Sequence, residues 1–152
     1  MVVPYSLSPL KDWQSENYRE IIRRIEVAGH VAVIIGGKNE SELIRRNFAG
    51  VKSFAGKTNL RESAEIISRA DLQISGCTSM LHVCSTTSTP AVAIYGPTTP
   101  AQWAPKKNCT VISKNFPCSP CYNVAGKPPC ADNKCIKEIS VDEVWAVVKN
   151  FL

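Results

Sequence analysis

Hydrophobic and polar positions alternate along the chain with two different periods. Short apolar runs rich in β-branched residues recur, and the segments between them place apolar residues at every third or fourth position. The first pattern is typical of buried strands and the second of amphipathic helices. We therefore expect strands at residues 1–5, 30–35, 51–54, 72–75, 90–95 and 109–113.

Two apolar stripes predict helices with particular clarity. The first consists of Tyr18, Ile21, Ile22, Ile25 and Ala28, and Gly29 is expected to end that helix. The second, at the C-terminus, consists of Val141, Val144, Trp145, Val148, Phe151 and Leu152, and we expect it to pack through Val144, Trp145 and Val148. Capping-box spacing marks three helix starts, at Asn39 with Glu42, Asn59 with Glu62, and Ser140 with Glu143.

Alternating strands and helices indicate right-handed βαβ units in a chain whose 152 residues fit one domain. The runs at 31–35 and 91–95 are apolar throughout, as in parallel strands covered on both faces. The prediction is an α/β fold with a doubly wound, largely parallel, Rossmann-like sheet. Ligands of such sheets bind at the carboxyl ends of the strands, so the turns after the strands are the candidate sites.

The turn after the first expected strand contains Ser6 and Lys11 and leads into a helix near Ser15. A lysine, a hydroxyl and the amides of a helix start are groups that bind a diphosphate. A polar connection without a ligand is the alternative interpretation.

The turn after the second strand contains Gly36, Gly37 and Glu40. Two glycines let a ligand approach the backbone, and a carboxylate just beyond them can accept hydrogen bonds from a ribose diol. Alternatively, Glu40 serves only as a negative charge that favours the start of its helix.

The turn after the fourth strand has the most specific pattern, with Cys77, Thr78 and Ser79 at a helix start and His82 one turn further on. Thr78 and Ser79 place small hydroxyl groups beside amides that are free at a helix start. His82 is close enough to face the same anion, although a structural histidine is an equally good interpretation.

Three strings together resemble glycosyltransferase family 9, the lipopolysaccharide heptosyltransferases: Ala55-Gly-Lys-Thr-Asn-Leu60, Thr78-Ser-Met-Leu-His82 and Tyr95-Gly-Pro-Thr98. The resemblance covers nearly the whole chain but only the C-terminal half of such an enzyme. It implies that residues 1–152 form the nucleotide-sugar-binding domain of a GT-B glycosyltransferase, without the N-terminal acceptor domain. A first strand that begins at residue 1 or 2 also favours truncation of a longer protein.

The resemblance also implies which residues bind the donor. The implied set is Ser6, Lys11, Gly37, Glu40, Thr58, Cys77, Thr78, Ser79 and His82, with Thr58 near the nucleobase. Cys77 stands where the family has Asp, and Ser79 stands where it has Gly. Because a thiol cannot accept hydrogen bonds as a carboxylate does, either the donor sugar differs or the activity is weakened.

The activity implied by the resemblance is inverting sugar transfer without a metal cofactor, from an ADP-heptose-like donor, in the synthesis of lipopolysaccharide or a related surface glycan. The general base is expected in the N-terminal domain, and His82 is a candidate stabiliser of the leaving group. The chain alone is expected to bind a nucleotide sugar and to catalyse nothing. The alternatives are a non-catalytic nucleotide-binding module of the same fold and another two-domain sugar enzyme, such as a nucleotide-sugar epimerase.

The formal net charge of +5 arises in residues 104–137, which contain six lysines and one acid. Such a segment suits an anionic glycolipid acceptor or peripheral contact with a membrane, or it is a solvated loop. Nucleic acid is disfavoured because no recognition motif accompanies the charge. With neither a membrane-spanning run nor a signal peptide, we expect a cytoplasmic protein, with the inner face of the inner membrane as its place of contact.

Residues 114–139, rich in Cys, Pro and Lys, are expected to form an irregular excursion before the last helix. Within it, Cys118, Cys121, Cys130 and Cys135 have C-x2-C-x8-C-x4-C spacing. Four thiols so close in sequence could bind a structural zinc ion. Two disulfides or four reduced thiols are the alternatives, and a cytosolic location argues against disulfides with a function.

Overall fold

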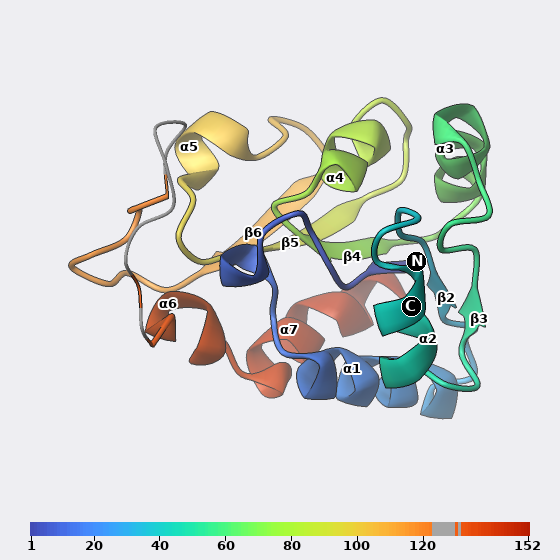
Figure 1. Ribbon diagram of the computed structural model, residues 1–152, viewed down its shortest axis with the longest axis horizontal. Coiled ribbons are helices and arrows are strands. Elements are labelled where there is room, and N and C mark those ends of the chain that lie inside the picture. Colours follow the sequence, from blue (N-terminus) through green and yellow to red (C-terminus); the bar gives the residue numbers. More distant parts are fainter. Residues whose placement is uncertain (123–129, 131) are drawn as a thin grey trace.

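The computed structural model describes residues 1–122, 130 and 132–152. Its centre is a parallel sheet that confirms the expected α/β, doubly wound fold (Figure 1). The strands are β1 (Val2–Val3), β2 (Val33–Ile34), β3 (Lys52–Ser53), β4 (Gln73–Gly76), β5 (Ala91–Tyr95) and β6 (Cys109–Ser113).

Helices cover both faces of the sheet (Figure 1). One layer contains α1 (Ser15–Val27), α2 (Ser41–Asn47), α6 (Lys134–Lys137) and α7 (Val141–Val148). The other contains α3 (Leu60–Ser68), α4 (Ser79–Cys84) and α5 (Pro100–Trp103). Short 3-10 turns lie at Pro9–Lys11 and Lys149–Phe151. Among the helices described, none has the length and apolar character needed to cross a bilayer.

The strand order β3-β2-β1-β4-β5-β6 positions the functional site. The winding of the chain reverses between β1 and β4, which are neighbours in the sheet. In parallel sheets of this order, the loops after the two strands at the reversal diverge and leave a crevice beyond the carboxyl ends of the strands.

Two apolar clusters hold the helices to the sheet. The larger lies under α1 and α7 and includes Trp13, Tyr18 and Ile74, all almost completely buried. The smaller lies under α3 and α4 around Ile67 and Leu81. The expected packing of the last helix is confirmed, since Val144 and Val148 are fully buried and the partly buried Trp145 packs against the same cluster.

The capping boxes at Asn59 with Glu62 and at Ser140 with Glu143 are both confirmed. The box predicted at Asn39 is wrong, because α2 begins two residues later and its N-cap is Glu40. A turn in which the Ser41 amide and hydroxyl both donate to the carbonyl of Lys38 precedes the helix. That turn moves the helix start beyond Asn39.

The end of α1 follows the sequence prediction. Gly29 has a φ of +87°, the left-handed conformation that glycine adopts without strain. The amide of Gly29 donates to the carbonyl of Glu26, and the amide of His30 donates to the carbonyl of Ile25. This bonding pattern is a Schellman motif, which satisfies carbonyls that the helix end leaves open.

Candidate functional site

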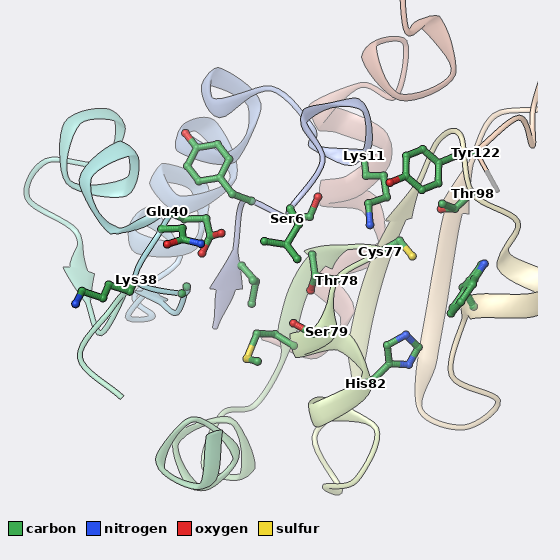
Figure 2. Close-up of a pocket in the computed structure, with 18 residues that line it drawn as sticks. Ser6, Lys11, Lys38, Glu40, Cys77, Thr78, Ser79, His82, Thr98 and Tyr122 are labelled. Atoms are coloured by element: carbon green, nitrogen blue, oxygen red, sulfur yellow. The ribbon is translucent and has the colours of Figure 1, made fainter. Parts of the chain in front are cut away.

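A cavity of about 550 Å³ opens beyond the carboxyl ends of β1, β2 and β4. Its walls come from the loops after these strands, from α4, and from residues beyond β5 (Figure 2). The volume lies within the range of small-molecule sites, roughly 300–1,000 Å³. The cavity therefore occupies the crevice that the strand order creates.

The structure brings together all but one of the residues predicted to bind the donor. Those that line the cavity are Ser6, Lys11, Gly37, Glu40, Cys77, Thr78, Ser79 and His82. Thr58 does not line it, because its loop follows the edge strand β3, which lies two strands away from the reversal. The Thr58 hydroxyl instead forms a hydrogen bond of 2.9 Å with the hydroxyl of Ser63.

In the loop after β1, Asp12 fixes the conformation of Ser6. Its Oδ1 atom accepts hydrogen bonds from the Ser6 amide at 2.8 Å and from the Ser6 hydroxyl at 2.7 Å. Burial raises the pKa of Asp12 to about 6, although the bonds from Ser6 and the charge of Lys11 act in the opposite direction. Asp12 was not among the predicted site residues.

Lys11 places the ammonium group of this loop in the cavity. Its Nζ lies 5.4 Å from the centre of the Tyr122 ring, and none of the ion pairs formed by the described residues includes it. A Cβ atom added at Gly76 would lie 3.0 Å from the Lys11 carbonyl oxygen. The glycine in β4 therefore permits the close approach of the loop that carries Lys11.

In the loop after β2, Glu40 brings a half-buried carboxylate to the opposite end of the cavity (Figure 2). Although Glu40 is the N-cap of α2, its side chain makes no capping hydrogen bond. The carboxylate lies against Gly37, where an added Cβ would be 2.5 Å from Oε2. Its oxygens are thus available to accept hydrogen bonds from hydroxyl groups of a ligand.

The loop after β4 contributes Thr78, Ser79 and His82. The Thr78 hydroxyl accepts a hydrogen bond of 3.4 Å from the Leu81 amide and so caps α4. Ser79 is exposed at the first position of the helix. The exposed His82 ring packs edge-on to Trp103, with the ring centres 6.5 Å apart.

Cys77 forms a nearly closed part of the cavity wall, with 7% of its surface exposed. The neighbouring Tyr95 hydroxyl is buried and has no hydrogen-bond partner among the described residues. Burial raises the pKa of Tyr95, and the nearby Cys77 thiol raises it further. The cavity wall at Cys77 is therefore apolar, whereas an aspartate at this position would bring a negative charge.

Residues beyond β5 complete the cavity, and they were not predicted from the sequence as site residues. They are Thr98, Trp103 and Tyr122. Thr98 and Tyr122 lie at the end opposite Glu40 (Figure 2). The amides of Cys121 and Tyr122 both donate to the carbonyl of Pro97 at 2.9 Å. Of these residues, only Thr98 could have been predicted from the sequence, because it lies in the Gly-Pro-Thr turn. Tyr122 reaches the site through these long-range bonds, which its local sequence does not indicate.

The lysine-rich segment is partly neutralised. Lys114 pairs with Glu143, while Lys134 and Lys137 lie 3.4 and 4.0 Å from the carboxylate of Asp132. Lys127 lies outside the described residues. Where it is described, the segment at 114–139 is irregular except for α6, a short helix that the sequence did not indicate. Its charge does not form an uninterrupted basic surface there.

All seven cysteines are free thiols. Within the described ranges, no group of three or more metal-binding side chains is arranged to hold an ion. The four thiols of the excursion nevertheless influence one another, since burial raises the pKa of Cys135 and the neighbouring Cys121, Cys130 and Cys118 raise it further. The structural zinc ion therefore stays a prediction of the sequence.

Elemental analysis of the purified chain checks that prediction. If zinc binds the four cysteines, about one ion per chain is expected, and it should be lost when Cys121 is replaced by serine. Cys109→Ser is the matched control, because Cys109 lies outside the cluster, in β6. Protein that contains no bound metal after preparation in zinc-supplemented medium would contradict the prediction.

Comparison with known proteins places these features in a family. The model of glycosyltransferase family 9 (heptosyltransferase) matches residues 1–129. The lipooligosaccharide heptosyltransferase 2 of Campylobacter jejuni is 24% identical over 156 aligned residues, which cover 97% of this chain and 48% of the relative. The chain thus spans about half the length of the curated relatives it matches.

Solved structures show the same fold. The ADP-heptose heptosyltransferase II of Escherichia coli superimposes with a TM-score of 0.78 at 18% identity, covering 99% of this chain and 45% of the other. The E. coli heptosyltransferase WaaC with ADP gives a TM-score of 0.75 at 21% identity, covering 99% of this chain and 44% of the other.

Proposed function

Because the chain belongs to glycosyltransferase family 9, we propose that its cavity binds the nucleotide-sugar donor of an inverting glycosyltransferase. The observation that carries the proposal is the pair Lys11 and Glu40, at opposite ends of one cavity at the reversal of the sheet (Figure 2). Lys11 brings an ammonium group without an ion-pair partner among the described residues, and Glu40 brings an available carboxylate. Hydroxyl groups of Ser6 and Ser79 lie between them.

The positions of these groups suggest how a nucleotide sugar lies. Glu40 accepts hydrogen bonds from the ribose diol, as acidic residues of doubly wound folds do. Lys11 and Ser6 bind the diphosphate through charge-assisted hydrogen bonds. The sugar then lies at the end lined by Cys77, Thr98 and His82. We propose an ADP-heptose-like donor, since relatives are heptosyltransferases and one was solved with ADP.

In the proposed reaction, a hydroxyl of the acceptor attacks the anomeric carbon and the nucleoside diphosphate departs. Lys11, with His82 at the rim, stabilises the negative charge that grows on the leaving group. The general base is proposed to come from a part of the enzyme outside this sequence, so this chain alone binds the donor without turnover. The acceptor is an anionic glycolipid of lipopolysaccharide synthesis, met at the cytoplasmic face of the inner membrane.

Calorimetric titration of the chain with ADP, GDP, UDP and CDP tests the donor site. We expect ADP to bind most tightly, with the other nucleotides weaker because the same diphosphate contacts remain while the base contacts change. Absence of binding by any of the four at millimolar concentration would refute the proposal.

Cys77 and Ser79, which stand in place of the Asp and Gly of the family pattern, favour a second candidate, a non-catalytic nucleotide module. This candidate predicts that the full-length protein binds ADP-heptose without turnover.

Cys77→Asp distinguishes an active enzyme with altered sugar choice from a decayed heptosyltransferase. In the active enzyme, a carboxylate at this nearly buried position would be desolvated beside a diphosphate, so donor binding is expected to weaken. Donor affinity and turnover of the full-length variant are measured against the parent. Cys77→Ser is the matched control, because it changes the size little and adds no charge. Improved turnover with ADP-heptose in the aspartate variant would favour the decayed enzyme.

A further inference from the structure

Asp12 determines whether the Ser6 hydroxyl, the one hydrogen-bond donor of that side chain, is free to bind a ligand. With Asp12 ionised, the Ser6 hydroxyl donates its single proton to Oδ1 at 2.7 Å or to the Ser8 carbonyl at 3.0 Å. In either arrangement the hydroxyl has no proton left for a ligand. An ionised Asp12 therefore withholds a hydrogen-bond donor from the cavity that Ser6 lines.

The ionised carboxylate is also a negative charge close to the place of an anion. A phosphate oxygen bonded to the Ser6 hydroxyl would lie within about 5.5 Å of Asp12 Oδ1, given ordinary hydrogen-bond lengths. Like charges at that distance, away from bulk water, repel strongly and favour the neutral carboxyl group. Protonation removes the repulsion and lets Asp12 act as a donor toward Ser6, which frees the serine proton for the ligand.

We propose that Asp12 is a positioning residue of the anion site, which takes up a proton when a diphosphate binds and thereby releases the Ser6 hydroxyl to it. This inference rests on the proposed donor site. The proton comes from solvent and stays on the Asp12 carboxyl group, so no covalent bond of the ligand changes. The raised pKa of Asp12, about 6 in the unliganded chain, puts such an uptake within reach at neutral pH.

Several charged or titratable groups lie near Asp12 or line the same cavity. Lys11, in the same loop, favours the ionised form of Asp12, and Glu40, before α2, favours the neutral form. Tyr18 of α1 is buried, and burial raises its pKa, so its hydroxyl stays neutral. His82 is a further titratable residue that lines the cavity, so the experiment must separate it from Asp12.

Calorimetry in buffers of different ionisation enthalpy measures the protons taken up on binding. ADP-glucose is the probe, because its diphosphate diester does not titrate between pH 5 and 8. At pH 7 we expect uptake of about half a proton or more per ligand bound to the parent. The affinity is expected to rise about tenfold from pH 8 to pH 6. In Asp12→Asn, both the uptake and this pH dependence should largely disappear.

His82→Gln is the matched control and should keep most of the uptake. Equal uptake in the parent and in Asp12→Asn would overturn the inference, as would uptake that disappears only in His82→Gln. Binding without any linked proton would overturn the inference and leave the proposed function intact. Failure of ADP-glucose and of the four nucleotides to bind would overturn both.

The pH dependence of the stability of the unliganded chain provides a second readout. Its expected direction is opposite to that of a carboxylate that stabilises the fold in its ionised form. The folded state raises the pKa of Asp12 from 3.8 to about 6, so it favours the neutral form. The stability of the parent relative to Asp12→Asn is therefore expected to fall as the pH rises from about 4 to 7. A stability advantage of the parent that instead grows over this range would show that the ionised carboxylate stabilises the fold, which contradicts the inference.

Discussion

Replacing Lys11 by alanine is expected to weaken the binding of ADP about ten- to a hundredfold, which corresponds to roughly 1.5–3 kcal/mol for a charge-assisted hydrogen bond. The ammonium lies in the cavity without an acidic partner among the described residues, held only near the Tyr122 ring. It forms no ion pair among these residues, although its charge lowers the pKa of Asp12, so the loss of affinity reports mainly on the contact with the diphosphate. Calorimetric titration with ADP gives the affinity directly.

Two further variants make the result specific. Lys57→Ala removes an exposed lysine outside the cavity and should leave the affinity unchanged. Lys11→Arg keeps the charge but changes the geometry of the donors, so an intermediate affinity is expected. Undiminished binding of ADP by Lys11→Ala would mean that the phosphates lie elsewhere, and the proposed orientation of the donor would have to be abandoned.

The fold could be predicted because its strands carry an unambiguous pattern. A covered parallel strand such as β5 is apolar at every position, and each expected run overlaps one strand of the sheet. The bounds were less predictable. The run at 30–35 yields only Val33–Ile34 as a strand, because the Schellman motif of α1 extends to His30 and leaves Val31 exposed.

The site was predictable where it depends on strand order and unpredictable where it depends on contacts between distant segments. Lys11 and Ser79 follow the two strands at the reversal, and Glu40 follows the strand next to them, so their positions along the chain indicate the cavity. Tyr122 comes from an irregular segment that is held by the carbonyl of Pro97, and nothing in its local sequence indicates this contact. Thr58 does not line the cavity, although the loop after β3 touches the cavity wall, since the Gly56 amide donates to the carbonyl of Gly36. The place of Thr58 near the nucleobase stays a prediction.

The sequence correctly indicated that Gly36 and Gly37 lie at the site, but the reason inferred for these glycines was incomplete. The sequence suggested that these glycines admit a ligand to the backbone. In the structure, a Cβ added at Gly36 would lie 2.5 Å from Ile44 Cδ1, and one at Gly37 would lie equally close to the Glu40 carboxylate. A side chain at either position would displace the end of the Ile44 or the Glu40 side chain, so the glycines also accommodate the packing of α2 and the present place of the Glu40 carboxylate.

Replacing Trp13 by alanine is expected to remove about 3–5 kcal/mol of folding stability, the usual cost of deleting a large buried side chain. Trp13 is 1% exposed and packs edge-on to Tyr18, with ring centres 5.2 Å apart. Its indole nitrogen donates a hydrogen bond of 2.8 Å to the carbonyl of Ile139. A single domain is stable by only about 5–15 kcal/mol, so the variant should unfold at a much lower urea concentration.

Trp13→Phe separates the two contributions of the indole. Phenylalanine keeps most of the apolar contact but leaves the Ile139 carbonyl without its donor, which costs about 1–3 kcal/mol. Urea unfolding should therefore rank the parent above Trp13→Phe and Trp13→Ala last. Because Trp13 follows Lys11 and Asp12 directly, it also anchors their loop to the segment before α7. Trp13 does not line the cavity, but the folded fraction of Trp13→Ala should nevertheless bind ADP more weakly, because its loop is less firmly held. An alanine variant as stable as the parent would show that the loop is held by other contacts.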